Sequence, residues 1–386
     1  MTPIVTFLFG ILLAAILPKI SWSKHGNLPS IFILGAQKGG SSSLFEFLIE
    51  HPILCRGVKK ELHFFDDHKK YGWQTGNMPS KSDYMKLFPG DPDCVKKDVH
   101  YRYIDATTML HVMDTISKWM YEFYTPEERS ELKFIAILRD PVARDFSWYQ
   151  QVARDQLGGD PSQRSGGGEE CVAFNMMNTM READMLHARH IRRSGRYAEQ
   201  LGNFTTYFRR DQLFVLSSQT LFRNTSTVMD ALSQFLGVEK VKRWDEAMPH
   251  DDHLGHKSWT DIVDCMLEHI PKLDCSFRDE LARYYEPYNA KLYEWLRETR
   301  AAASPYEPPF HQFGDAYKSI PCVADARAEY NALIAADPTA TCRKIQREQR
   351  PRALRAVALP EEDSDKNQGG ATGGLRERKR RSKKRV

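Results

Sequence analysis

The chain has 386 residues, of which 41% are hydrophobic and 11% aromatic; this is enough apolar material for a substantial core and excludes a largely disordered polypeptide. Its seven cysteines show no zinc-binding spacing. Its small net charge of +4 comes from the C-terminal tail, so the rest of the chain has no excess of basic residues over acidic ones.

The first stretch, residues 3–17, is almost wholly apolar and is followed by Lys19 and Lys24. Such a stretch is short for a helix that crosses a bilayer, and it suits the core of a signal peptide or a short signal anchor. A buried strand is the alternative. We expect residues 1–24 to take the chain into the secretory pathway and, if they are not cleaved, to hold it on a membrane.

The sequence IFILGAQKGGSSSLFEF predicts a strand over 31–35, a loop rich in glycine and serine, and a helix over 41–50. Backbone N–H groups and the positive end of a helix dipole then meet at one point, which makes an anion site. A Walker loop would have its lysine at Ser41, whereas here the lysine comes earlier, at Lys38. The loop therefore predicts a cradle for a phosphate ester without a magnesium-bound triphosphate; a glycine turn that only allows close packing is the alternative.

The next apolar stretch predicts a strand over 62–66. Glu61 and His63 are two residues apart, so on a strand they would point to the same side. Partial burial of Glu61 would raise its pKa and make it a better base near neutral pH. The alternatives are that Glu61 pairs with Lys59 or Lys60 at a solvated edge and that His63 is an ordinary strand histidine.

A further strand, over 133–138, ends at Arg139 and is followed by a proline and a predicted helix over 142–154. Ser147 lies about two turns into that helix. Arg139 and Ser147 would then converge on a second phosphate, to which a guanidinium can donate two hydrogen bonds. Pairing of Arg139 with Asp140, or capping of a sheet edge, is the alternative.

The rest of the chain continues the alternation of strands and helices. It predicts a Gly/Ser-rich loop over 158–168 and helical pieces over 171–190, followed by a helix over 196–208 and a strand over 213–217. Two more helices are predicted over 227–236 and 278–298. This alternation predicts an α/β fold with a central parallel sheet flanked by helices. Ligands in such folds bind beyond the carboxyl ends of the strands, where Lys38, Glu61 and Arg139 are all expected.

After residue 300 the pattern is weaker: a proline-rich break at 304–309, a short helix within 317–341, and two cysteines, Cys322 and Cys342, that are candidates for a disulfide. Residues 375–386 carry eight basic side chains against one acidic. No aromatic residue lies among them, so a base-stacking surface for nucleic acid is not expected. A solvated disordered end, attraction to a glycan or membrane, and a nuclear import signal are the alternatives, in that order.

Together these segments resemble the carbohydrate sulfotransferases of the heparan sulfate and chondroitin type, which have a P-loop-like fold and use 3′-phosphoadenosine 5′-phosphosulfate. The 5′-phosphosulfate loop of that family is matched by Lys38, Gly39, Gly40, Ser41, Ser42 and Ser43. The resemblance implies that Lys38 contacts the phosphosulfate and that Arg139 and Ser147 hold the 3′-phosphate. It implies that Glu61 is the base. His63, expected on the same side of the strand as Glu61, would then be a partner for the acceptor hydroxyl or the sulfuryl oxygens, so Lys38, Glu61 and His63 are the expected catalytic residues.

The resemblance covers residues 30–298 and implies the rest of the organisation. It predicts a sulfotransferase domain over 29–300, a C-terminal extension over 301–359 and a basic tail over 360–386. The expected acceptor is a glycan hydroxyl, on a polysaccharide, and no metal is expected. The implied location is the Golgi membrane or lumen, with type II orientation if the N-terminal segment is not cleaved.

The cysteines, the glycosylation sequons and the stretch after Asp105 can also be compared with the family. Cys265 and Cys275 resemble the loop disulfide that the family places ahead of its last helix, and sequons at Asn203 and Asn224 permit glycosylation in that compartment. Heparan-type enzymes usually carry a Glu-Lys-Thr-Pro stretch with another catalytic lysine, whereas this chain reads DATTM from Asp105. That version is closer to the relatives that sulfate chondroitin, so the acceptor sugar stays open.

Two other functions compete with sulfuryl transfer. A P-loop kinase is disfavoured because Ser41 stands at the Walker lysine position and no clear magnesium-binding carboxylate follows a strand. A non-catalytic protein that binds polyanions would work through residues 375–386, and would lose its function if they were deleted.

Overall fold

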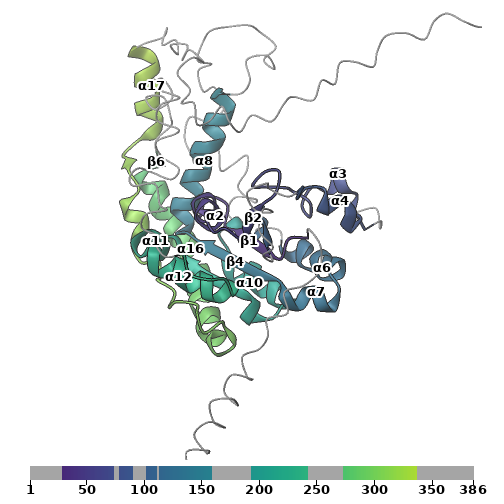
Figure 1. The fold of residues 1–386 in the computed structure, drawn as a ribbon. Coiled ribbons are helices and arrows are strands. Elements are labelled where there is room, and N and C mark those ends of the chain that lie inside the picture. The colour runs from purple at the N-terminus through teal and green to yellow at the C-terminus, as the bar shows by residue number, and fades with distance from the viewer. Residues whose placement is uncertain are drawn as a thin grey trace, which may run out of the picture. The chain divides into compact units, whose positions relative to one another are not determined.

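The structure is a computed structural model, and it describes residues 28–73, 78–89, 101–110, 113–158, 193–241 and 273–336. Its centre is a five-stranded sheet in the order β2-β3-β1-β4-β5 (Figure 1). The strands are β1 (Ile31–Gly35), β2 (Leu54–Arg56), β3 (Arg102–Asp105), β4 (Lys133–Leu138) and β5 (Leu213–Ser217). Every neighbouring pair in this sheet is parallel, which confirms the predicted α/β fold with a central parallel sheet.

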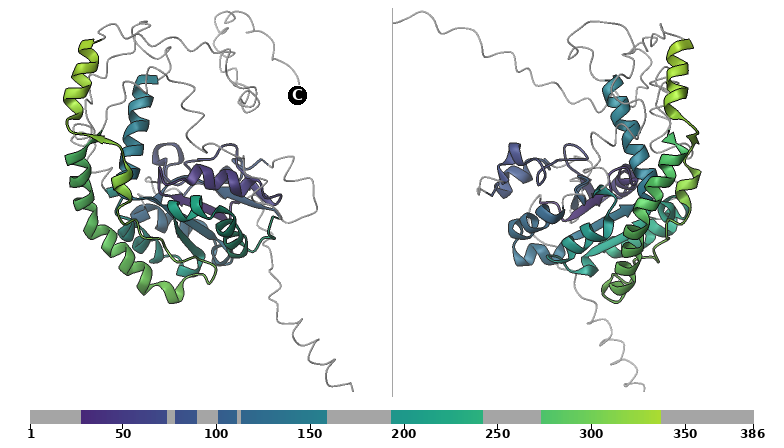
Figure 2. Two further views of the ribbon diagram at one scale, coloured as in Figure 1. Left: turned by 90° about the vertical axis from the view of Figure 1, so that its left-hand side faces the viewer. Right: turned by 180° about the vertical axis from the view of Figure 1, so that it is seen from behind.

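Helices cover both faces of this sheet (Figure 2). The helices of the described residues are α2 (Ser41–Ile49), α3 (His68–Tyr71), α4 (Lys81–Met85), α6 (Met113–Phe123), α7 (Pro126–Glu131), α8 (Pro141–Gly158), α10 (Tyr197–Thr205), α11 (Ser218–Arg223), α12 (Thr225–Leu236), α16 (Cys275–Glu298) and α17 (Ala326–Ala336). The helix predictions beginning at 41, 142, 196, 227 and 278 are confirmed to within three residues at their start. The predicted loop over 158–168 and the helical pieces over 171–190 lie almost wholly outside the described residues.

The side chains of the central strands alternate between two apolar cores. Ile31 and Ile33 of β1 pack in the core that contains α2 and α12. Phe32 and Leu34 pack in the opposite core, with α6, α10 and the end of α16. Successive strand residues point to opposite faces, so a run of apolar residues with no polar interruption is what a strand covered on both sides requires.

The predicted strand over 62–66 is wrong. This segment is a turn, in which His63 has a φ of 55°. The two residues after His63 are Phe64 and Phe65, and both are fully buried among aromatic rings that include Trp73 and Tyr84. A strand would send two successive side chains to opposite faces, whereas the turn sends both rings into one core. The strands actually present on this side are β2 and β3, which are short and were not predicted.

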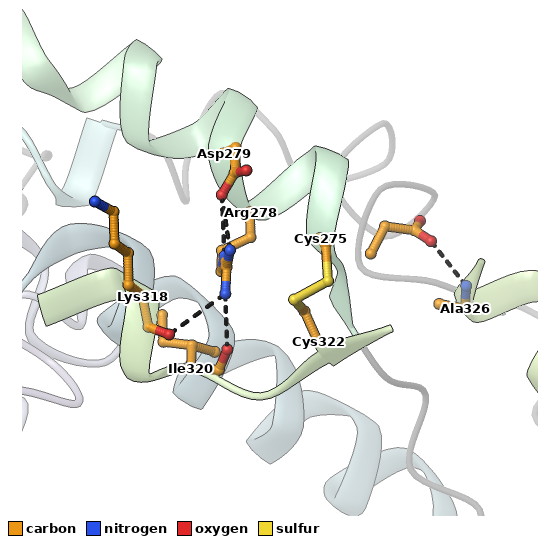
Figure 3. The surroundings of a disulfide bond; sticks show 8 residues. Cys275, Arg278, Asp279, Lys318, Ile320, Cys322 and Ala326 are labelled. Carbon is orange, nitrogen blue, oxygen red and sulfur yellow. Dashed lines mark hydrogen bonds and ion pairs between the residues drawn. A yellow bond between two sulfur atoms is a disulfide. The ribbon is translucent and has the colours of Figure 1, made fainter. Parts of the chain in front are cut away.

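A disulfide joins the start of α16 to a segment after residue 300 (Figure 3). The bond links Cys275 to Cys322, so the expected pairing of Cys275 with Cys265 and the candidate pairing of Cys322 with Cys342 are both wrong. The two cysteines meet because the short strands β6 (Leu273–Asp274) and β7 (Cys322–Val323) pair with each other. This pairing is formed across 47 residues of sequence, and no local spacing signals it.

Residues beyond 300 continue to pack against the sheet. Glu307 is buried and forms an ion pair with Arg210 at 2.6 Å, and its carboxylate also accepts a hydrogen bond from the Val215 amide of β5 at 2.7 Å. Within the ranges that the structure describes, no helix is both long and apolar enough to span a bilayer. Residues 1–24, for which a signal or anchor is predicted, lie outside those ranges.

Candidate active site

The loop between β1 and α2 lies close against the backbone of β4. A Cβ atom on Gly39 would come within 2.6 Å of the Ile137 carbonyl oxygen and 2.8 Å of the Ala36 carbonyl oxygen. Gly40 has a φ of 102°, a conformation that side chains rarely allow, and it precedes the first residue of α2. The glycines therefore let the chain turn sharply into a helix N-terminus, and the first N–H groups of that helix have no acceptors within it.

Lys38 and Arg139 meet at this loop, at the carboxyl ends of β1 and β4. The Arg139 Nη1 atom donates to the Lys38 carbonyl oxygen over 3.3 Å, and the Lys38 Nζ atom donates to Gln151 Oε1 of α8 over 2.9 Å. Burial lowers the pKa of Arg139. The Tyr197 hydroxyl donates to the Arg139 carbonyl oxygen over 2.8 Å, which fixes the backbone that carries the guanidinium.

Asp140, the alternative partner for Arg139, caps the next helix instead. Its Oδ1 atom accepts a hydrogen bond from the Ala143 amide over 2.9 Å, at the start of α8. Burial raises the pKa of Asp140 to about 6. Ser147 lies further along α8 and is half-buried. Within the described part of the chain, no hydrogen bond joins Ser147 to Arg139 or to the loop, so its convergence with Arg139 stays a prediction.

Glu61 lies next to the same loop, linked to it through Lys60. The Lys60 ammonium is 2.6 Å from Glu61 Oε1 and 3.4 Å from the hydroxyl oxygen of Ser41, the first residue of α2. The Glu61 side chain is 35% exposed. Glu61 therefore does pair with Lys60, as the alternative interpretation held, but the pair faces the phosphate loop and not only solvent.

His63 comes close to Glu61, although not through the predicted strand. The turn places His63 Nε2 3.7 Å from Glu61 Oε2 and His63 Nδ1 2.9 Å from Asp66 Oδ2. The hydrogen bond with the Asp66 carboxylate raises the pKa of His63 and outweighs the opposing effect of burial. The two residues expected on the acceptor side are thus together, with a carboxylate orienting the imidazole.

A buried polar group supports this turn. The Thr107 hydroxyl oxygen accepts hydrogen bonds from the amides of Leu62 at 2.9 Å and His63 at 3.2 Å, and the hydroxyl donates to Asp105 Oδ1 over 2.6 Å. The other Asp105 oxygen accepts from the Tyr84 hydroxyl at 2.5 Å. Burial raises the pKa of Asp105. Thr107, Asp105 and Tyr84 were not foreseen as part of the site; the signal was the polar DATT sequence after a strand, in the stretch that departs from the heparan-type pattern.

The loop after β1 therefore brings together Lys38, Arg139 and Glu61, three of the residues that the sequence analysis assigned to the sulfuryl donor and the glycan acceptor. A comparison with known proteins decides the family. Residues 28–251, more than half of the chain, match the model of the sulfotransferase domain. The chain belongs to the sulfotransferase family. The resemblance inferred from its motifs is therefore confirmed, and the kinase alternative is not supported.

Relatives of this sulfotransferase carry a second activity in their names. Mouse bifunctional heparan sulfate N-deacetylase/N-sulfotransferase 4 is 25% identical over 308 residues, covering 72% of this chain and 31% of the relative. Human bifunctional heparan sulfate N-deacetylase/N-sulfotransferase 3 is 26% identical over 301 residues, with the same two shares. The chain thus spans about a third of the length of these relatives. A solved structure of a sulfotransferase from Alicyclobacillus acidocaldarius is similar with a TM-score of 0.48 and 23% identity, covering 70% of this chain and 96% of its own.

Sulfotransferases of the type this chain resembles close a basic, glycine-rich loop over the nucleotide, and the nearest candidate for it in this sequence is HLGHK at 253–257. That segment lies outside the described residues. Among the residues that are described, no group of three or more histidine, cysteine or acidic side chains is placed to hold a metal ion.

Proposed function

We propose that this sulfotransferase transfers a sulfuryl group from 3′-phosphoadenosine 5′-phosphosulfate to a glycan. The observation that carries the proposal is the meeting of Lys38, Arg139 and, through Lys60, Glu61 at one glycine loop. Cations and a helix N-terminus suit the two phosphates of the donor, and a carboxylate beside them suits an acceptor that must lose a proton.

On the donor side, Lys38 and the loop from Gly39 to Ser43 hold the 5′-phosphosulfate. Arg139 and Ser147 hold the 3′-phosphate, which separates this donor from nucleotides that lack it. A guanidinium suits this task because its planar donors can bind a phosphate with two hydrogen bonds.

The reaction is an in-line displacement at sulfur. A bond forms between the acceptor atom and sulfur while the bond from sulfur to the leaving phosphate oxygen breaks, and the acceptor proton passes to Glu61. Negative charge grows on the leaving phosphate, where Lys38 and the loop amides stabilise it. His63 sits between Glu61 and Asp66; in its protonated form it donates to a sulfuryl oxygen, and no metal is needed to neutralise the leaving group.

The acceptor is a glycan, and a polysaccharide suits the names of the relatives, which contain heparan sulfate. The sequence motifs alone favour a hydroxyl acceptor. The same names describe transfer to nitrogen, which makes a glucosamine amine the second candidate acceptor. A primary amine reacts by the same displacement, with Glu61 again taking the proton.

We place the enzyme in the secretory pathway and divide its chain into a signal segment, a catalytic domain and C-terminal segments. Residues 1–24 direct the chain to the Golgi membrane or lumen, where Asn203 and Asn224 are glycosylated. The catalytic domain covers 29–300, with an extension over 301–359 and a basic tail over 360–386 that takes no part in the chemistry.

An acceptor-array assay tests the proposal. The full chain is given labelled donor and a panel of heparan- and chondroitin-type oligosaccharides, and the product is mapped by mass spectrometry and NMR. We expect label on a single sugar type, and the mapped atom decides between oxygen and nitrogen. A chain lacking residues 375–386 should still turn over a small acceptor; a full chain that shows no turnover but binds polyanions, and loses that binding with the tail, would favour the polyanion-binding alternative instead.

A further inference from the structure

Beyond Arg139, two more side chains hold the backbone of the phosphate loop. The Gln37 carbonyl oxygen accepts from Arg144 Nε over 3.2 Å. The Gly39 carbonyl oxygen accepts from the Ser218 hydroxyl over 2.5 Å. Since the carbonyl of Lys38 between them is also held, three consecutive peptide oxygens of the loop are bound by side chains from outside it.

These contacts set the direction of the loop amides. In a planar trans peptide the carbonyl group and the next N–H group point in opposite directions. Holding the Gly39 oxygen therefore fixes the Gly40 N–H, and holding the Gln37 oxygen fixes the Lys38 N–H. A carbonyl oxygen carries partial negative charge and repels a phosphate, so turning these oxygens away leaves the attractive N–H groups facing the anion.

Arg144 is itself held by a chain of buried groups that ends on α16. It is 1% exposed, and its Nη1 atom lies 2.5 Å from Asp145 Oδ1. Asp145 Oδ2 accepts from the Tyr285 hydroxyl over 2.5 Å, and burial raises the pKa of Tyr285 well above its usual value, so the hydroxyl stays a donor. The Tyr285 ring also packs tightly, since a Cβ atom on Gly195 would come within 2.6 Å of it.

Buried charges need partners and fixed geometry, because an unpaired charge in the interior is costly. The chain from Tyr285 through Asp145 to Arg144 supplies both, and it connects a helix near the end of the domain to a loop near its start. Nothing in the proposed mechanism uses these groups chemically, because their polar atoms are engaged with each other and with the loop backbone.

We propose that Ser218, Arg144 and, through Asp145, Tyr285 are positioning residues for the donor loop. They hold loop oxygens away from the bound phosphosulfate and so determine donor affinity without touching the acceptor. This inference rests on the proposed function, because it takes the anion at the loop to be the 5′-phosphate end of the donor.

Ser218→Ala tests the inference, with Ser233→Ala as its matched control. Both serines are buried and both hydroxyls donate to a carbonyl oxygen, but that of Ser233 bonds to Met229 in its own helix. The full chain and both variants are titrated by calorimetry with adenosine 3′,5′-bisphosphate, and the Michaelis constants for donor and acceptor are measured separately. Loss of one neutral hydrogen bond predicts a drop in nucleotide affinity of about three- to tenfold for Ser218→Ala, with the acceptor constant unchanged.

Tyr285→Phe and its control Tyr293→Phe extend the test along α16. Tyr293 lies on the same helix, and its hydroxyl accepts from the Phe313 amide instead of donating to Asp145. We expect weaker bisphosphate binding only for Tyr285→Phe. Suppose that the parent binds the bisphosphate. If Ser218→Ala and Tyr285→Phe bind it as tightly as the parent, or lose no more affinity than their controls, the positioning role is wrong while the proposed function stands. A parent that does not bind the bisphosphate overturns both.

Discussion

The two sides of the candidate site are built differently. On the donor side, the loop after β1 lies against the backbone of β4, so tightly that Gly39 has no room for a side chain. On the acceptor side, Glu61 and His63 stand on a turn that is tied to the sheet through Thr107, and their side chains are 35% and 45% exposed. The comparison fits a tightly packed cradle for the proposed donor and a more open surface for the proposed polymeric acceptor.

This difference predicts that substitutions on the two sides separate donor binding from chemistry. The largest effect is expected for Glu61→Gln, which keeps the shape of the side chain but removes the base. We expect kcat to fall about 100- to 10,000-fold, the usual range for a general base, with affinity for adenosine 3′,5′-bisphosphate unchanged. Glu50→Gln, at the exposed end of α2, is the control. Activity within a few-fold of the parent would remove Glu61 from the mechanism.

Arg139→Ala is expected to have the next largest effect, now on donor binding. Loss of charged hydrogen bonds to the 3′-phosphate costs about 1.5–3 kcal/mol, which is about 10- to 100-fold in bisphosphate affinity. Calorimetry measures this directly. Arg209→Ala removes an exposed arginine that pairs with Asp211 and should leave binding intact. Equal affinity for parent and Arg139→Ala would take Arg139 out of the site.

Thr107→Val sharpens the comparison because Thr107 holds only the acceptor side. It removes the acceptor of the Leu62 and His63 amides, the first of them buried, and the donor to Asp105, so we expect a loss of about 1–3 kcal/mol in the free energy of unfolding together with a lower kcat. Bisphosphate affinity should not change. Thr225→Val, whose hydroxyl donates to the Leu221 carbonyl oxygen of the preceding helix α11, is the control, and a loss of donor binding in Thr107→Val would show that the two sides are not separable.

The smallest expected effect is the pH dependence of the acceptor side. The hydrogen bond with Asp66 raises the pKa of His63 above 6.5 in the folded protein. Its contribution to stability is therefore fully present below 6.5 and is lost as the pH rises through the folded-state value. His63→Gln should flatten that part of the stability profile by less than about 1 kcal/mol, because the pair is partly exposed. Denaturant unfolding of parent and variant across this range measures it, and identical pH profiles would contradict it.

The same contrast explains what the sequence alone could reveal. The strand, glycine turn and helix around Lys38 are contiguous, and so are the strand and helix around Arg139; each therefore carries its own local signal. The acceptor side joins residues near 61 to residues near 105, and its strands β2 and β3 have three and four residues. Strands this short give too little alternation to be recognised.

Two further features required contacts between distant segments. The Cys275–Cys322 disulfide depends on the pairing of β6 with β7, and a family resemblance pointed to a different partner for Cys275. The hydrogen bonds of Arg144 and Ser218 to the loop cross 107 and 179 residues of sequence. Arg144 lies in a helix that the sequence predicts, whereas no helix was predicted at Ser218, where α11 begins; neither local sequence indicates a contact with the loop.

The central claim is that one pocket binds both phosphates of a doubly phosphorylated adenosine, and titration calorimetry tests it most directly. The full chain is titrated in parallel with adenosine 3′,5′-bisphosphate, adenosine 5′-phosphate and adenosine 3′-phosphate. The account predicts that the bisphosphate binds at least about tenfold more tightly than either monophosphate, because each phosphate has its own charged contacts. Equal affinity for all three nucleotides would contradict it.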